Sequence, residues 1–106
     1  CTGSFVLHAA GLLNGRKSTT HWSMLDALRA RGDVEVVEER FVRDGNVWSA
    51  AGVSAGIDLM LAFIAETAGE EAAATVQYGA EYYPSARRYG SVHRTHPSAP
   101  KYMRDG

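Results

Sequence analysis

The sequence is short of several features whose scarcity limits what the chain can be. It has one cysteine, Cys1, so no disulfide can form within the chain, which favours a reducing compartment. Its 11 lysines and arginines nearly balance its 12 aspartates and glutamates, so the charge gives no support to binding of nucleic acid or a membrane surface. The longest apolar run, residues 59–65, is far shorter than the roughly 20 residues that a membrane span needs, and no secretory signal pattern is visible. We predict a cytoplasmic protein that binds neither nucleic acid nor membranes.

The composition is otherwise that of an ordinary globular domain. The chain has 106 residues, of which 45% are hydrophobic and 22% charged, enough for one domain with a modest core. All three prolines lie after residue 83, among glycines, serines and charged residues that follow neither a helical nor a strand period. We predict that residues 1–82 form one α/β unit and that residues 83–106 form an irregular C-terminal arm.

Hydrophobic periodicity and turn signals predict helices that alternate with strands. Residues 14–15 (NG) are a helix stop, Ser23 and Ser54 are placed to cap helices, and residues 44–45 (DG) are the strongest hairpin signal. The predicted helices are residues 3–13, 23–31, 57–69 and 70–82, and the predicted strands are residues 17–21, 34–37, 41–42 and 47–48.

This alternation indicates a parallel or mixed sheet with both faces covered by helices. Residues 57–65 are apolar all round apart from Asp58, which is typical of a buried crossover helix. The chain supplies few strands for such a sheet. We therefore expect further strands to precede Cys1, and we expect that residues 1–106 do not fold alone.

Cys1 is the first candidate for chemistry. It stands at the mouth of the predicted helix, where unpaired backbone N–H groups and the helix dipole favour a thiolate. From its chemistry alone, a lone cysteine is also compatible with a small hydrophobic side chain in a core. His21, at the end of a predicted strand, is compatible both with a proton-exchange partner and with a structural hydrogen bond.

The remaining histidines do not predict a metal site or a cofactor. His93 and His96 lie three residues apart in the predicted arm, and the sequence offers no evident third ligand. The small-residue turn at residues 52–56 lacks the lysine of a Walker loop and the spacing of a dinucleotide fingerprint. We predict no metal and no cofactor.

Four sequence blocks resemble a known family in their order and spacing. They are residues 1–4 (CTGS), 9–15 (AAGLLNG), 19–22 (TTHW) and 45–58 (GNVWSAAGVSAGID). Over residues 1–84 the chain resembles the ThiJ/PfpI superfamily, also called the DJ-one superfamily, which has the class I glutamine-amidotransferase-like fold. Within it, the chain is most similar to isonitrile hydratases of the cyclohexyl-isocyanide type and to sensor domains that precede AraC-type DNA-binding modules.

The resemblance implies an α/β fold, a three-layer flavodoxin-like sandwich with a mainly parallel sheet, of which this chain holds only the C-terminal half. It implies as partners the missing N-terminal half, on a separate or cleaved chain, and a second copy in a homodimer. An acidic residue that acts with the thiol would lie in the missing half.

The resemblance also implies roles for individual residues. Cys1 falls on the nucleophile of a strand-to-helix elbow, and Thr2 falls on the residue whose backbone N–H helps to form an oxyanion hole. His21 falls on a family histidine close to the cysteine. The implied substrate-binding residues are Gly3, Gly52 and Val53.

Three functions stay open from the sequence. The first is a cysteine-dependent hydratase that adds water to a small-molecule isonitrile and forms an N-substituted formamide through a Cys1 thioimidate. The second is a ligand-sensing domain of an AraC-type regulator, or a glyoxalase-like, deglycase-like or peptidase-like member of the same superfamily. The third, an N-terminal nucleophile hydrolase, fits the α/β alternation less well because such enzymes have stacked antiparallel sheets.

Overall fold

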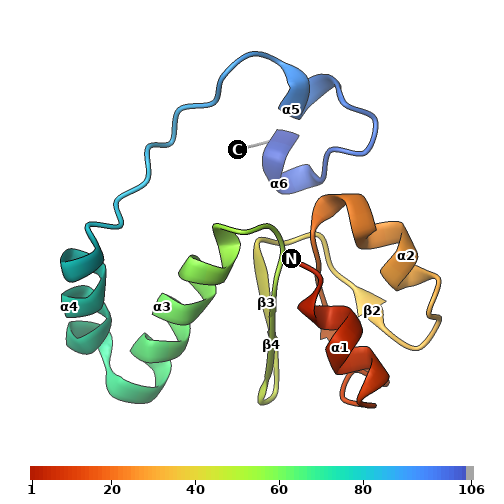
Figure 1. Cartoon of the computed structure of the whole chain (residues 1–106), viewed down its shortest axis with the longest axis horizontal. Coiled ribbons are helices and arrows are strands. Elements are labelled where there is room, and N and C mark those ends of the chain that lie inside the picture. Colours follow the sequence, from red (N-terminus) through yellow and green to blue (C-terminus); the bar gives the residue numbers. More distant parts are fainter. Residues whose placement is uncertain (105–106) are drawn as a thin grey trace.

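The elements of the chain follow one another as a mixed α/β structure (Figure 1). The computed structural model describes residues 1–104. In chain order the elements are α1 (Gly3–Ala9), β1 (Lys17–Ser18), the 3₁₀ turn η1 (Trp22–Met24), α2 (Leu25–Arg29), β2 (Glu35–Val36), β3 (Phe41–Asp44), β4 (Val47–Ala50), α3 (Ala55–Ala68), α4 (Glu70–Ala80), α5 (Val92–Thr95) and α6 (Lys101–Arg104). The predicted α/β class is confirmed.

The described strands pair in two ways. β1 and β2 are parallel, with Ser18 opposite Val36, and β3 and β4 form an antiparallel hairpin in which Asp44 is opposite Val47. Gly45 takes φ +61° at the tip of this hairpin, a left-handed conformation that favours glycine. The hairpin predicted from residues 44–45 is confirmed.

A seam of buried hydroxyl groups joins β1 to the hairpin. The Ser49 Oγ of β4 accepts a 3.0 Å hydrogen bond from the backbone N–H of Thr19 and another of 3.0 Å from Ser18 Oγ. At the other end of the seam, the backbone N–H of Lys17 donates to Asp44 Oδ2 over 2.7 Å. Among the described residues, every buried side-chain nitrogen and oxygen has a hydrogen-bond partner, so the burial of this polar seam is compensated.

The predicted strand at residues 17–21 pairs over only two residues because its remaining polar groups have other partners. Thr19 donates its N–H to a side chain of the hairpin, and Thr20 Oγ1 donates to the backbone of Cys1. Residues 19–21 thus leave the β1–β2 ladder and run toward the start of α1.

The first helix ends four residues before its predicted end. Gly11 takes φ +78°, and its N–H donates to His8 O over 2.9 Å, while the N–H of Leu12 donates to Leu7 O over 3.0 Å. These two bonds form a Schellman motif, which closes the helix at Ala9 and Ala10. Gly11 therefore ends the helix. The Asn-Gly pair at residues 14–15, which was predicted to end it, belongs to the following turn.

Of the two predicted serine caps, Ser23 is wrong, whereas Ser54 holds the N-cap position of α3 without a capping bond. The ring of His21 caps the turn before α2, because its Nδ1 accepts a 3.2 Å bond from the backbone N–H of Ser23. Ser54 directly precedes α3, but its side chain makes no capping bond. Ser54 Oγ instead lies 3.5 Å from a guanidinium nitrogen of Arg40.

The core is small, and its residues come from α2, the hairpin, α3, α4 and the connecting segments. Its buried apolar residues are Leu13, Leu25, Leu28, Val42, Ala51, Ala55, Ala73 and Ala99. The accessible surface is 6892 Å², about 1,100 Å² more than is typical of a folded chain of this mass. The excess indicates apolar surface that the described residues do not cover.

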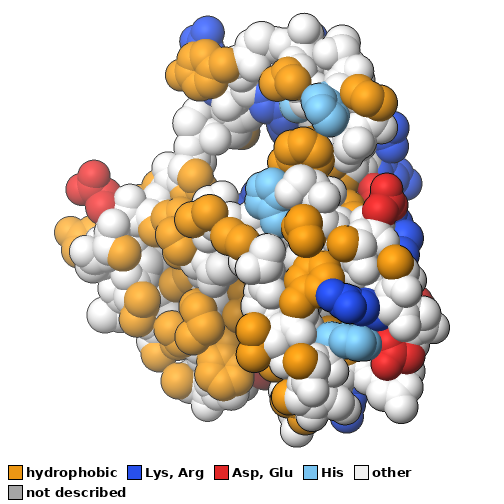
Figure 2. Space-filling view, turned by 45° about the vertical axis from the view of Figure 1, so that its right-hand side comes forward, with side chains coloured by type: hydrophobic (Ala, Val, Ile, Leu, Met, Phe, Trp, Pro, Cys, Tyr) orange, Lys and Arg blue, Asp and Glu red, His pale blue; other side chains and the backbone are white. Residues whose placement is uncertain are grey.

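Among the described residues, α3 is not buried on all sides, although its sequence is typical of a buried crossover helix. Ile57 is 46% exposed, Met60 51% and Phe63 39%. One side of α3 packs on α4 and another on the hairpin, where the Trp48 and Phe63 rings meet edge to face with centroids 5.6 Å apart. Figure 2 shows hydrophobic side chains gathered on the lower left of the surface, where Figure 1 places α3 and α4.

The arm is more structured than predicted. Residues 83–91 leave α4, and the single-turn helices α5 and α6 follow; four residues make one turn, too few to give a periodic sequence signal. The arm returns to the body at Trp22, whose ring lies 5.0 Å from that of His96 in an edge-on contact, and its residues Ala99 and Pro100 are buried. The division into residues 1–82 and 83–106 stays a prediction.

Over residues 1–104, none of the helices combines the length and the apolar character that crossing a bilayer requires.

Candidate functional site

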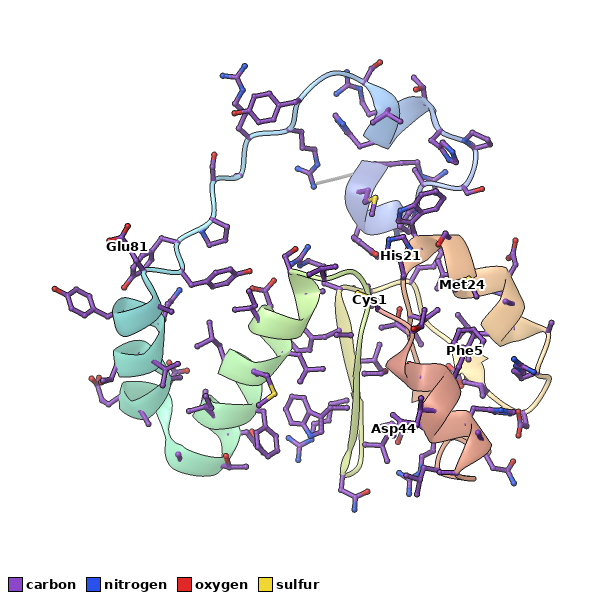
Figure 3. All side chains as sticks on the ribbon, viewed as in Figure 1. Cys1, Phe5, His21, Met24, Asp44 and Glu81 are labelled. Atoms are coloured by element: carbon purple, nitrogen blue, oxygen red, sulfur yellow. The ribbon has the colours of Figure 1, made fainter. Side chains whose placement is uncertain are left out.

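Cys1 stands in front of α1 with an exposed thiol (Figure 3). Thr2 occupies the N-cap position of α1, and its carbonyl accepts the first bond of the helix, from Phe5 N at 3.1 Å. The N–H groups of Gly3 and Ser4 come before this bond, at the start of a helix, where backbone N–H groups have no intrahelical acceptors. This is the arrangement that the sequence predicted for residues 1–3.

The backbone of Cys1 is fixed by the segment that contains His21. Its carbonyl accepts a 2.6 Å bond from Thr20 Oγ1 and a 2.8 Å bond from the backbone N–H of His21. The structure therefore brings together the two residues that the sequence singled out. The sequence reasoning missed Thr20, although its hydroxyl is the group that holds Cys1 in place.

The imidazole of His21 is oriented by Ser23. Its Nδ1 accepts from the Ser23 backbone N–H at 3.2 Å and lies 2.8 Å from Ser23 Oγ. Because Nδ1 accepts an N–H bond, the proton of the neutral ring is assigned to Nε2. His21 thus has one ring nitrogen fixed by its neighbours and one available to exchange a proton with a ligand.

The turn at residues 52–54 lies near the His21 ring. A Cβ atom added to Gly52 would lie 3.9 Å from His21 Cδ2, so a larger side chain at this position would contact the ring. Val53 is 81% exposed and offers its side chain to solvent. Gly3 has open space where a Cβ would project. The structure therefore places the backbone of His21 next to Cys1 and the ring of His21 near Gly52.

A hollow of about 270 Å³ lies against Cys1. Its size is slightly below the range of small-molecule pockets. Neither His21 nor Gly52 belongs to its walls. The walls are formed by Cys1, Gly3, Ser4, Leu7, Trp48, Ser49, Ala50 and Leu59.

A buried serine anchors the start of α1 to the strands. Ser4 is 5% exposed, its Oγ donates to Thr19 O, and it lies 3.2 Å from Ser18 Oγ. Ser4 was not singled out in the sequence; a serine one turn after the candidate nucleophile, with a Ser-Thr-Thr run after β1, was the available signal. These bonds fix the direction in which α1 presents Cys1.

The histidines of the arm do not form a metal site. His93 Nε2 lies 3.0 Å from the Arg94 guanidinium, and desolvation together with the charges of Arg94 and Arg88 lowers the pKa of His93. His96 Nδ1 accepts from the N–H of Ser98 at 3.1 Å. Nowhere in residues 1–104 do three histidine, cysteine or acidic side chains come close enough to share an ion.

Comparison with known proteins gives a family match that starts at Cys1. The model of the DJ-1/PfpI family matches residues 1–66. The crystal structure of a ThiJ/PfpI family protein from Pseudomonas syringae is similar over 99% of this chain, with a TM-score of 0.77 and 41% sequence identity. That match covers 42% of the Pseudomonas syringae chain.

Curated relatives include an enzyme and transcriptional regulators. The isonitrile hydratase of Pseudomonas putida is 44% identical over 99 residues, which are 93% of this chain and 43% of the hydratase. The HTH-type transcriptional regulator CdhR of Pseudomonas aeruginosa is 45% identical over 76 residues, 71% of this chain and 23% of the regulator. The HTH-type transcriptional regulator GlxA of Rhizobium meliloti is 39% identical over 96 residues, 86% of this chain and 30% of the regulator.

The chain thus spans less than half the length of these relatives. The family match covers more than half of this chain and includes Cys1, His21 and Gly52. The similarity to the solved structure extends over α1, the strands and both long helices, with the same mixed α/β fold. On this evidence, the chain belongs to the DJ-1/PfpI family.

Proposed function

We propose that the protein carrying this chain is a cysteine-dependent isonitrile hydratase with Cys1 as its nucleophile. The observation that carries the proposal is the exposed Cys1 thiol in front of α1, with its carbonyl bonded to Thr20 and His21, in a chain 44% identical to an isonitrile hydratase. An activated cysteine next to a proton-exchanging group is the arrangement that covalent catalysis needs. The activity is proposed for the whole protein, because the chain spans 43% of that relative.

The proposed reaction proceeds in two balanced steps. The Cys1 thiolate adds to the terminal carbon of R–N≡C, and that carbon takes a proton, which gives the thioimidate R–N=CH–S–Cys1. Water then adds to the same carbon while nitrogen gains a proton, and the C–S bond breaks. The products are the formamide R–NH–CHO and the free thiol, so water is the only reactant consumed besides the isonitrile.

The remaining residues of the site have proposed roles in these steps. The Nε2 of His21 is the group we assign to proton exchange, because its Nδ1 is occupied by Ser23. The backbone N–H of Thr2 is the group we assign to charge that develops on the substrate. The proposed substrate-binding residues are Gly3, Gly52 and Val53.

Partners are also proposed. The exposed apolar side chains of α3 are compatible with cover by a further part of the fold or by a second copy in a homodimer. The substrate would be a small molecule.

A second function is favoured by a separate observation. Two HTH-type transcriptional regulators, CdhR and GlxA, match this chain at 45% and 39% identity. In a ligand-sensing domain, the region around Cys1 would bind a small molecule and release it unchanged. Turnover therefore distinguishes the two functions.

The test is incubation of the full protein that carries this sequence with cyclohexyl isonitrile. We expect N-cyclohexylformamide in the product spectrum and, under rapid quench, a mass increase on the peptide that contains Cys1. Cys1→Ser should abolish turnover while the far-UV circular dichroism stays unchanged. Formamide formation by Cys1→Ser at the wild-type rate would contradict the nucleophile, and saturable binding without formamide would support the sensor function.

A further inference from the structure

A polar network contacts the 52–54 turn at Ser54. Its centre is Asp58, in the first turn of α3. Arg40 donates to Asp58 Oδ2 from Nε over 2.9 Å and from a terminal guanidinium nitrogen over 2.6 Å. Tyr82 donates its hydroxyl proton to Asp58 Oδ1 over 2.8 Å. Both oxygens of one carboxylate are therefore engaged, each by a different segment of the chain.

The backbone at the end of α4 directs Tyr82 into this network. Glu81 takes φ +51°, a left-handed conformation and the one positive φ among the non-glycine residues described (Figure 3 labels it). The N–H of Tyr82 then bonds to Gln77 O at 3.0 Å, and Gln77 Nε2 donates to Tyr82 O over 3.1 Å. These bonds hold Tyr82 at the end of the helix and let its ring reach 24 residues back to Asp58.

Both partners of Asp58 also contact the turn. The carbonyl of Arg40 accepts a 2.8 Å bond from Ala51 N, and its guanidinium lies 3.5 Å from Ser54 Oγ. The Tyr82 hydroxyl lies 3.4 Å from Ser54 O, a longer contact than its bond to Asp58. The network therefore touches the turn at its last residue, Ser54, and the residue before the turn, Ala51.

The turn has little apolar packing of its own to fix its position. Val53 is 81% exposed, and Gly52 has no side chain. The buried residues at its two ends, Ala51 and Ala55, anchor the chain but leave the tip free. The position of the tip relative to His21 then depends on the polar contacts behind it.

We propose that Arg40, Asp58 and Tyr82 are positioning residues that hold the 52–54 turn beside the His21 ring and so fix Gly52 and Val53, the two residues of the turn that we assign to substrate binding. This inference rests on the proposed hydratase function. None of the three contacts Cys1, so they act through the turn and take no part in the reaction itself.

The first test is Tyr82→Phe in the full protein that carries this sequence, because it removes one hydroxyl and keeps the ring. We expect KM for cyclohexyl isonitrile to rise about five- to tenfold with kcat nearly unchanged, since the turn binds substrate and does not react. Tyr83→Phe is the matched control, because Tyr83 is the next residue and is 61% exposed. Asp58→Asn, which keeps the shape and removes the charge, should raise KM in the same direction.

A second readout needs no turnover. In Tyr82→Phe we expect faster amide exchange at Ala55, whose N–H bonds to Gly52 O at 3.1 Å, and a shifted His21 ring signal in the NMR spectrum. An unchanged KM together with an unchanged His21 signal would overturn the positioning role, even if the variant were less stable. If the wild type makes no formamide but the His21 signal still moves in Tyr82→Phe, the hydratase proposal fails and the positioning role stands.

Discussion

At the scale of single residues, the site depends on a hydroxyl that carries no chemistry of its own. Thr20 is fully buried, and its Oγ1 donates 2.6 Å to the carbonyl of Cys1. Without this bond, one of the two groups that hold the Cys1 backbone would be lost. The other is the N–H of His21, the next residue in the chain.

Thr20→Val should therefore show how the bond to the Cys1 carbonyl affects the position of Cys1, because Thr20 itself does not react. The change keeps the shape and leaves the Cys1 carbonyl with one donor fewer, so we expect the free energy of unfolding to fall by about 1–3 kcal/mol. We also expect slower alkylation of Cys1 by iodoacetamide, because the thiol is held less firmly. Urea unfolding and alkylation rates are the measurements, with Thr20→Ser as the control that keeps the hydroxyl. Equal alkylation rates in Thr20→Val and wild type would show that this bond does not order the nucleophile.

Tyr82 gives a prediction with a defined pH range. The hydrogen bond to Asp58 is the main cause that raises the pKa of Tyr82 above its ordinary value of 10.0. A raised pKa in the folded state means that the bond contributes stability below pH 10.0 and that this contribution is lost as the pH rises through the folded-state pKa. The stability difference between wild type and Tyr82→Phe should shrink from pH 8 to pH 11 in urea unfolding. A difference that stays constant over this range would contradict the Asp58 bond.

At the scale of elements, residue patterns predicted which segments are helices and strands better than where these end. The hairpin is encoded locally, since the glycine at its tip is in the sequence and its pairing is short-range. The end of α1 and the cap of α2 are harder to predict, because in each case two nearby residues can supply the same signal. Gly11 competes with the later Asn-Gly pair, and the His21 ring competes with the Ser23 hydroxyl.

In the candidate site, too, some residues could be predicted from the sequence and others could not. Cys1, His21 and Gly52 were predicted from a family-like pattern, and the structure places the backbone of His21 next to Cys1 and its ring near Gly52. Thr20 and Ser4 were not predicted, because their role is a bond to backbone 15 to 19 residues away that no local pattern encodes.

Gly11 offers a test of how α1 ends. Its φ of +78° strains any residue with a Cβ, so Gly11→Ala should lower the free energy of unfolding by about 1 kcal/mol or more. Gly79 is the matched control: it lies inside α4, and a Cβ there meets open space, so Gly79→Ala should stabilise the helix by roughly 0.5–1 kcal/mol. Chemical denaturation of both variants measures the contrast. Two changes of the same sign would contradict the assigned end of α1.

At the scale of the whole molecule, the described residues leave an apolar face uncovered. The long dimensions of the chain are 40 and 37 Å against a thickness of 18 Å, and its radius of gyration of 14.8 Å exceeds the ~13 Å of a compact domain of this length. Three of the exposed large hydrophobic side chains, those of Ile57, Met60 and Phe63, belong to α3, the helix whose sequence is typical of a buried crossover helix. The sequence pattern and the observed exposure agree if α3 packs against something beyond residues 1–104.

Residues 1–106 prepared alone should therefore behave as a protein with an exposed apolar face. Because Ile57, Met60 and Phe63 would face water, we expect strong binding of the dye ANS, association that increases with concentration, and a broad thermal transition. Met60→Lys should reduce the association, since it places a charge in the centre of this face, whereas Ala68→Lys at the end of the same helix should not. Analytical ultracentrifugation and calorimetry are the measurements. A monomer that unfolds in one sharp transition without binding ANS would show that this small core is sufficient, and that α3 needs no further partner.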